Sequence, residues 1–299
     1  MEVRADGVIR IALCGPFSLS RNGRPIKLRL AGKTVDLLRF LLINAARPSR
    51  REYLADLFWG SADHARHRSA LSSAIWRIRQ ALDRVADLSL LAEGDAVRLV
   101  LGANVRVDAV ELARAVDDAA QRASDELHVS ARLVAALEAC DRPFLDGASD
   151  DWALVEQERF FELRMRGLAL MMRRCGETRR YGDALEFGRR LLAEDPFRES
   201  VHCEMMWLYV LSGQRARAIR QYRECETRLR NELGIAPMAE LQALRDLILQ
   251  DFGCAGARHP PAPSNASDAA LDRARLDVVF GAIERARQDV YTTLRDQLS

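Results

Sequence analysis

Residues 63–85 constrain the fold more than any other segment, because their pattern predicts one long amphipathic helix. Its apolar side recurs at helical spacing and predicts a buried face made of His67, Leu71, Ala74, Ile75, Ile78 and Leu82. The opposite side is basic and rich in hydroxyl groups, and with its flanks it holds Arg66, Arg68, Ser69, Ser72, Ser73, Trp76, Arg77, Arg79, Gln80 and Arg84. Arginine beside small hydroxyl donors suits the phosphates and base edges of DNA. We therefore expect the outer face of this helix to recognise DNA.

A β-hairpin follows the helix directly. The sequence SLLAEGDAVRLVLG alternates apolar and polar residues around Glu93-Gly94-Asp95, which is typical of two antiparallel strands and a tight turn. Trp76 on the outer helix face is expected to pack either on the sugar–phosphate backbone or under this hairpin.

Short elements precede the long helix. In chain order they are strands at 8–13 and 25–28 around the turn Asn22-Gly23, a helix from Gly32 to Arg47-Pro48, and a short helix closed by Trp59-Gly60. Together with the long helix and the hairpin they predict an α+β winged helix-turn-helix domain over residues 1–105. We expect this segment to fold and bind DNA alone, although more weakly than the full chain.

The start of the first helix contains Gly32-Lys33-Thr34, which resembles the end of a phosphate-binding loop. That motif also needs a glycine five residues before Gly32, and Lys27 occupies the position. The segment is therefore not expected to bind a nucleotide. Lys33 is expected to contact a DNA phosphate instead.

Charge is distributed unevenly along the chain. The whole sequence holds 45 Lys and Arg against 43 Asp and Glu, a net charge of +2. Residues 1–105 hold 17 basic and 10 acidic residues, a net charge of +7, and residues 106–299 hold 28 and 33, a net charge of −5. The first third is therefore the part that favours an anionic partner.

Residues 106–253 predict an all-α domain. Ala184-Leu185 is repeated as Ala218-Ile219 after 34 residues, the period of tetratricopeptide repeats. Stacked helix pairs of this kind usually bind other proteins or domains. Residues 254–267 are rich in Pro, Ala and Ser and predict a linker, and residues 268–299 predict an amphipathic C-terminal helix that docks on the repeats or joins a second chain.

Other classes of site find little support in the sequence. The six cysteines lie at least 22 residues apart, so no CxxC pair exists, and His64-x-x-His67 lacks a third ligand nearby. No HExxH sequence, glycine-rich loop or nucleophile motif is present. We expect neither an enzyme nor a bound metal or cofactor. The absence of a signal-peptide pattern or an apolar membrane span predicts a cytoplasmic chain.

Four longer segments carry a family resemblance. Residues 11–85, from IALCGPFSLS to RIRQALDRV, resemble the DNA-binding domain of SARP-type transcriptional regulators. The bacterial transcriptional activator domain of the same regulators is resembled by DDWALVEQER and by the paired segments 181–200 and 217–237, the second of which ends in ELGIAP. The resemblance covers residues 8–252. It implies an OmpR/PhoB-like winged helix followed by a tetratricopeptide-like domain.

The same resemblance implies particular partners and contacts. These are promoter DNA, bound as tandem direct repeats, and RNA polymerase, which an activator recruits. The family's recognition helix falls on residues 64–84, its DNA-facing positions fall on Arg66, Ser69, Ser72, Ser73, Arg77 and Arg79, and its wing falls on Gly94 to Arg98. We expect weak self-association on DNA and no membrane partner. The alternative function is a protein-interaction scaffold whose basic domain contacts an acidic partner, and duplex binding that falls steeply with salt separates the two.

Overall fold

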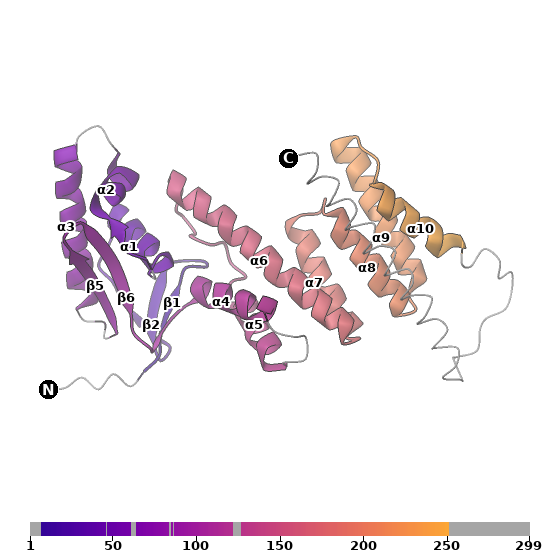
Figure 1. Cartoon of the computed structure of the whole chain (residues 1–299), viewed down its shortest axis with the longest axis horizontal. Coiled ribbons are helices and arrows are strands. Elements are labelled where there is room, and N and C mark those ends of the chain that lie inside the picture. The colour runs from indigo at the N-terminus through magenta and orange to yellow at the C-terminus, as the bar shows by residue number, and fades with distance from the viewer. Residues whose placement is uncertain are drawn as a thin grey trace. The chain divides into compact units, whose positions relative to one another are not determined.

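The computed structural model describes residues 7–45, 47–60, 64–83, 85, 87–121 and 127–250 (Figure 1). The linker expected at 254–267 and the helix expected at 268–299 lie outside these residues. Among the described helices, none is both long enough and apolar enough to cross a membrane.

A small four-stranded sheet opens the chain. Its strands are β1 (Ile9–Ala12), β2 (Ser18–Arg21), β3 (Arg24–Ile26) and β7 (Val105–Val107), in the order β3-β2-β1-β7. The pairs β1–β2 and β2–β3 are antiparallel, whereas β7 lies parallel to β1. The predicted turn is confirmed: Asn22 and Gly23 have φ of 50° and 79°, the left-handed conformations that a two-residue hairpin loop requires.

Three helices and a second sheet complete the winged helix-turn-helix. The helices are α1 (Lys33–Ile43), α2 (Arg51–Trp59) and α3 (His64–Leu82), and the sheet holds β4 (Ser49–Arg50), β5 (Leu88–Glu93) and β6 (Ala96–Leu101) in the order β4-β6-β5. Leu37, Leu54 and Val97 are fully buried where helices and sheet meet. Burial of these apolar side chains stabilises the packing of α1, α2 and β6. The predicted fold class is confirmed.

The remainder of the described chain is helical. It consists of α4 (Asp108–Gln121), α5 (Leu127–Ala139), α6 (Asp151–Glu177), α7 (Tyr181–Glu194), α8 (Glu199–Leu211), α9 (Arg215–Arg228), a π-helical turn (Leu229–Leu233) and α10 (Ala239–Gln250). Helices α7 and α9 are both 14 residues long and begin 34 residues apart, at Tyr181 and Arg215. Ala184 and Ala218 are fully buried, as close helix packing requires. The predicted helical repeat is therefore present.

Several contacts join the sheet and the helices of residues 7–60 to the helical region. The carboxylate of Asp108, the first residue of α4, accepts hydrogen bonds from the backbone N–H groups of Leu13 and Cys14, both at 2.9 Å. The backbone N–H of Leu145 donates to the carbonyl of Leu13 at 2.9 Å. The boundary expected at 105/106 falls inside β7, which pairs with β1. These contacts predict that a fragment of residues 1–105 is less stable than the same residues in the full chain.

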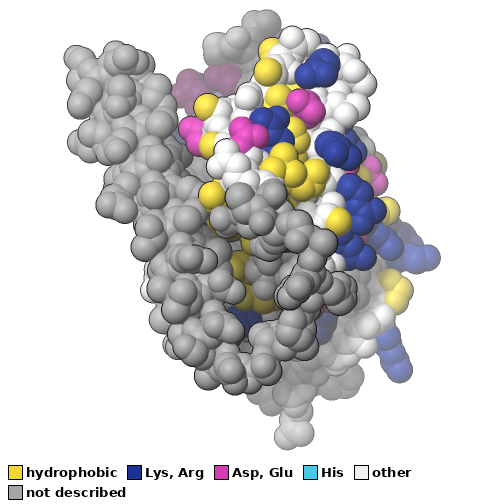
Figure 2. Space-filling view, turned by 90° about the vertical axis from the view of Figure 1, so that its right-hand side faces the viewer, with side chains coloured by type: hydrophobic (Ala, Val, Ile, Leu, Met, Phe, Trp, Pro, Cys, Tyr) yellow, Lys and Arg dark blue, Asp and Glu magenta, His cyan; other side chains and the backbone are white. Residues whose placement is uncertain are grey.

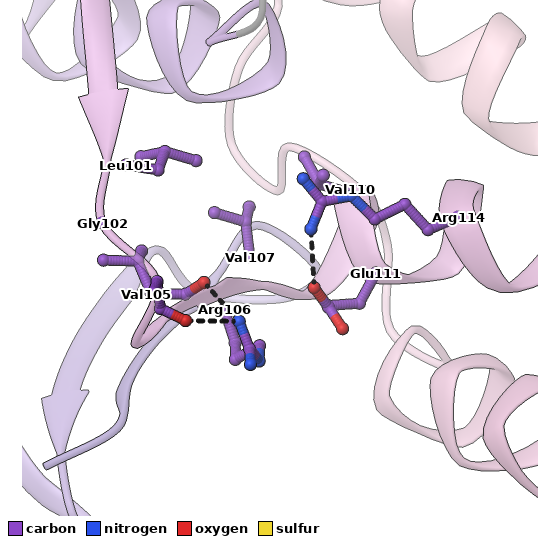
Figure 3. Close-up of a pocket in the computed structure, with 9 residues that line it drawn as sticks. Leu101, Gly102, Val105, Arg106, Val107, Val110, Glu111 and Arg114 are labelled. Atoms are coloured by element: carbon purple, nitrogen blue, oxygen red, sulfur yellow. Dashed lines mark hydrogen bonds and ion pairs between the residues drawn. The ribbon is translucent and has the colours of Figure 1, made fainter.

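A small cavity lies where β6, β7 and α4 meet (Figure 3). Its volume is about 200 Å³, below the ~300–1,000 Å³ typical of small-molecule sites. The Arg106 guanidinium donates to the carbonyl of Ala103 at 2.9 Å, and Arg114 pairs with Glu111 at 3.3 Å. We assign this cavity no ligand.

Candidate DNA interface

Helix α3 has the two faces that its sequence predicts. Leu71, Ile75 and Ile78 are at most 3% exposed and form the buried face. The described residues predicted to face DNA are all exposed: Lys33, Arg66, Arg68, Ser69, Ser72, Ser73, Trp76, Arg77, Arg79, Gln80, Gly94 and Arg98. Arg84 lies outside the described residues.

Two predictions about this helix are refined. His67, expected in the buried face, is only half-buried, and its Nδ1 contacts the carbonyl oxygen of Gly60 at the end of α2. This contact joins the end of α2 to the first turns of α3. Trp76 is 63% exposed, so it does not lie under the hairpin. Of the two expected positions, only the outward one agrees with the structure.

Arg79 is directed toward the hairpin. Its Nε donates to the carbonyl of Leu90 at 3.2 Å, and its Nη2 donates to the carbonyl of Ala92 at 3.5 Å, both in β5. The arginine was expected to face DNA because it lies on the flank of the outer helix face. In the structure, two of its N–H groups instead donate to carbonyl groups of β5, so the side chain links α3 to the wing.

Lys33 also has an internal partner. Its Nζ donates to the carbonyl of Phe58 at 2.5 Å, which joins the start of α1 to the end of α2. An ammonium carries three donors, so two N–H groups remain for other acceptors. The expected phosphate contact stays a prediction.

Arg68 lies near Glu52 of α2, with 3.9 Å between guanidinium nitrogen and carboxylate oxygen. Both side chains are about two-thirds exposed. Such exposed pairs contribute little stability, and salt screens them. The expected contact between Arg68 and DNA stays a prediction.

The wing is a regular hairpin. Gly94 has φ of 56° at its tip, a conformation that favours glycine. Arg98 is exposed between buried Val97 and Leu99, because successive strand residues point to opposite faces. Strand β4 adds a third strand through Ser49 and Arg50, which pair with β6. Two residues give too short a pattern for β4 to be predicted.

Comparisons with known proteins agree with this architecture. Residues 107–249 match the bacterial transcriptional activator domain. The Streptomyces coelicolor transcriptional regulator RedD is 30% identical over 286 residues, a match that covers 87% of this chain and 77% of RedD. The regulatory protein AfsR of the same species is 28% identical over 254 residues, and the match covers 83% of this chain but only 25% of AfsR. The chain therefore spans about a quarter of that relative.

A solved structure shows the same fold. EmbR of Mycobacterium tuberculosis, in complex with a low-affinity phosphopeptide, aligns with a TM-score of 0.67 at 24% identity, over 92% of this chain and 71% of that one. This likeness supports the arrangement of a winged helix followed by a helical domain. From its match to RedD and its activator domain, the chain belongs to the SARP family of transcriptional regulators.

Proposed function

We propose that this protein is a sequence-specific DNA-binding transcription activator whose helix α3 enters the major groove. The observation that carries the proposal is the outer face of α3, where Arg66, Arg77 and three serines are exposed opposite a fully packed apolar face. The exposed side chains can reach a ligand without disturbing the core. A helix fits the major groove, and arginine and serine are common donors to bases and phosphates.

The exposed residues divide into three kinds of contact. Arg66 and Arg77 are the candidates for base edges, since a guanidinium can donate two hydrogen bonds to guanine. The hydroxyl groups of Ser69, Ser72 and Ser73 and the amide of Gln80 suit phosphates or base edges. Trp76 would pack against the sugar–phosphate backbone, and Arg98 would contact phosphate from the wing.

Two copies would bind one operator. A single winged helix reads few base pairs, so useful specificity needs a second copy beside the first. A tandem direct repeat places the copies head to tail, which gives a heterologous contact rather than a two-fold one. Self-association that is weak in solution would then be significant only when two copies occupy neighbouring sites on DNA.

The helical domain would supply contacts to RNA polymerase. The segment after α9 exposes the apolar side chains of Leu233, Ile235 and Met238. Figure 2 shows exposed hydrophobic side chains beside Lys and Arg side chains on one described face of the chain. Exposed apolar side chains rimmed by charge are typical of protein-binding surfaces.

The test is selection of binding sites from a pool of random duplexes with the full chain. We expect enrichment of a direct repeat, and an affinity for it that falls linearly on a log–log plot against salt concentration. Enrichment of a palindrome would contradict the head-to-tail arrangement. Absence of any enriched sequence, together with equal competition by polyglutamate and by duplex, would support the alternative scaffold with an acidic partner.

A further inference from the structure

Three potential metal ligands converge where the first sheet meets the helical domain. The sulfur atoms of Cys14 and Cys140 and a carboxylate oxygen of Asp108 all lie within 4.8 Å of one another. Cys14 lies in the loop after β1, Cys140 directly follows α5, and Asp108 is the first residue of α4. The Cys14–Asp108–Cys140 cluster is therefore created by folding rather than by a local motif.

Backbone hydrogen bonds hold this cluster in place. The Asp108 carboxylate accepts from Leu13, Cys14 and its neighbour Ala109, the last at 2.7 Å. Cys14 forms an isolated β-bridge with Phe144, which follows Cys140 closely in sequence. Ligating carboxylates in metal sites are commonly oriented by such second hydrogen bonds. The ligands are thus arranged before any ion arrives.

The two cysteines of the cluster are buried, whereas its carboxylate is partly accessible. Cys14 is 5% exposed and Cys140 is 0% exposed, while Asp108 is half-buried. The hydrogen bond with Cys140, burial and the charge of Asp108 all raise the pKa of the Cys14 thiol.

We propose that the Cys14–Asp108–Cys140 cluster is a binding site for a thiophilic divalent cation, zinc being the best match. Two sulfur ligands and one carboxylate suit zinc, whereas magnesium and calcium prefer all-oxygen sites. Zinc ligands at bond lengths of ~2.0–2.3 Å lie roughly 3.5–4 Å from one another, so small movements close the site. The fourth position would hold a water molecule, on the half-buried side of Asp108.

Binding would change the protonation of the cluster. Zinc would displace both thiol protons into solvent, leaving two thiolates and one carboxylate around a doubly charged cation. Because protons compete with the metal, retention of zinc should weaken as the pH falls. The ion would also connect Cys14, which follows the first sheet, to two residues of the helical domain. This inference stands independently of DNA binding.

The test measures zinc per chain after the full reduced protein is loaded with zinc sulfate and desalted. We expect about one zinc per chain for the wild type and for Cys203→Ser, whose thiol lies in α8 outside the cluster. Cys14→Ser and Cys140→Ser should lose the metal, and Asp108→Asn should retain less. Wild type that retains no more zinc than Cys14→Ser would overturn the proposal.

A second measurement covers the case in which a serine variant misfolds. Cobalt chloride titrated into the wild type should produce an absorption band from thiolate-to-cobalt charge transfer, which excess zinc removes. Absence of that band would overturn the proposal. So would a disulfide between Cys14 and Cys140 in natively purified protein, seen by peptide mass spectrometry.

Discussion

The indole ring of Trp152, at the second position of α6, packs edge-on against the phenyl ring of Phe40 in α1, with 5.7 Å between ring centroids. Phe58 of α2 lies 5.4 Å from the same indole ring. The tryptophan is 5% exposed, so these rings form one buried aromatic contact between the winged helix and the activator domain. This contact ties the position of α1 and α2 to that of α6.

Removal of this ring should destabilise the protein. We expect Trp152→Ala to lower the free energy of unfolding by about 3–5 kcal/mol, because it leaves a cavity between the two regions. Trp152→Phe should cost only ~1–2 kcal/mol, since an aromatic ring remains and the indole N–H, which has no hydrogen-bond partner among the described residues, is removed. Urea unfolding measures both variants, and equal losses would contradict the aromatic packing argument.

Truncation gives a second prediction. A fragment of residues 1–105 loses two residues of β7, the Asp108 carboxylate and the cover that Trp152 provides over Phe40. We expect it to unfold at lower urea concentration than the full chain and to self-associate through the uncovered apolar surface. A fragment of residues 1–121, which keeps β7 and α4, should recover part of the loss. Identical urea midpoints for both fragments and the full chain would show that the contacts of residues 1–105 with the helical domain contribute no stability.

The buried histidine of the helical domain predicts a pH dependence. His202 is 1% exposed; its Nδ1 accepts from the Gln221 amide at 2.9 Å and its Nε2 donates to the Pro196 carbonyl at 3.0 Å, an arrangement that requires the neutral ring. Burial lowers the pKa of His202, so the unfolded chain takes up the proton more readily than the folded one. The stability contributed is complete above the unfolded pKa of about 6.5 and is lost as the pH falls below it.

His202→Gln isolates this effect from the other titrating groups. The difference in free energy of unfolding between wild type and this variant should shrink between about pH 7.5 and about pH 5.5. Urea unfolding over that range provides the measurement. A difference that is constant with pH would mean that the ring does not titrate differently in the two states.

Substitution of Arg79 should affect DNA binding differently from the loss of a residue that contacts phosphate directly. Because its guanidinium binds the carbonyls of Leu90 and Ala92, Arg79→Ala should weaken DNA binding by loosening the wing while leaving the salt dependence unchanged. Arg98→Ala, by contrast, should reduce the salt slope by about one, as loss of a phosphate contact does. Fluorescence anisotropy at several salt concentrations measures both. A reduced salt slope for Arg79→Ala would instead indicate that its guanidinium contacts a DNA phosphate.

Strong periodic patterns made the main elements predictable. The two faces of α3 and the hairpin around Gly94 follow from helical and alternating spacing over many residues. Strands β2 and β7 are not predictable from the sequence, because SLSR carries one buried residue and VRV is only three residues long. The donors of Arg79 could not be placed, because angular position on a helix does not reveal which carbonyls of another element lie nearby. The Cys14–Asp108–Cys140 cluster likewise depends on tertiary contacts between distant segments.

Contact between the outer face of α3 and DNA is tested most directly by comparing the affinities of single-arginine variants. The affinity of the full chain for its selected duplex is compared with that of Arg66→Ala, Arg77→Ala and the control Arg159→Ala, an exposed arginine of α6. We predict that each α3 variant binds about 5- to 150-fold more weakly, which corresponds to ~1–3 kcal/mol, and that the control is unchanged. Wild-type affinity in both α3 variants would contradict the assignment of α3 as the recognition helix.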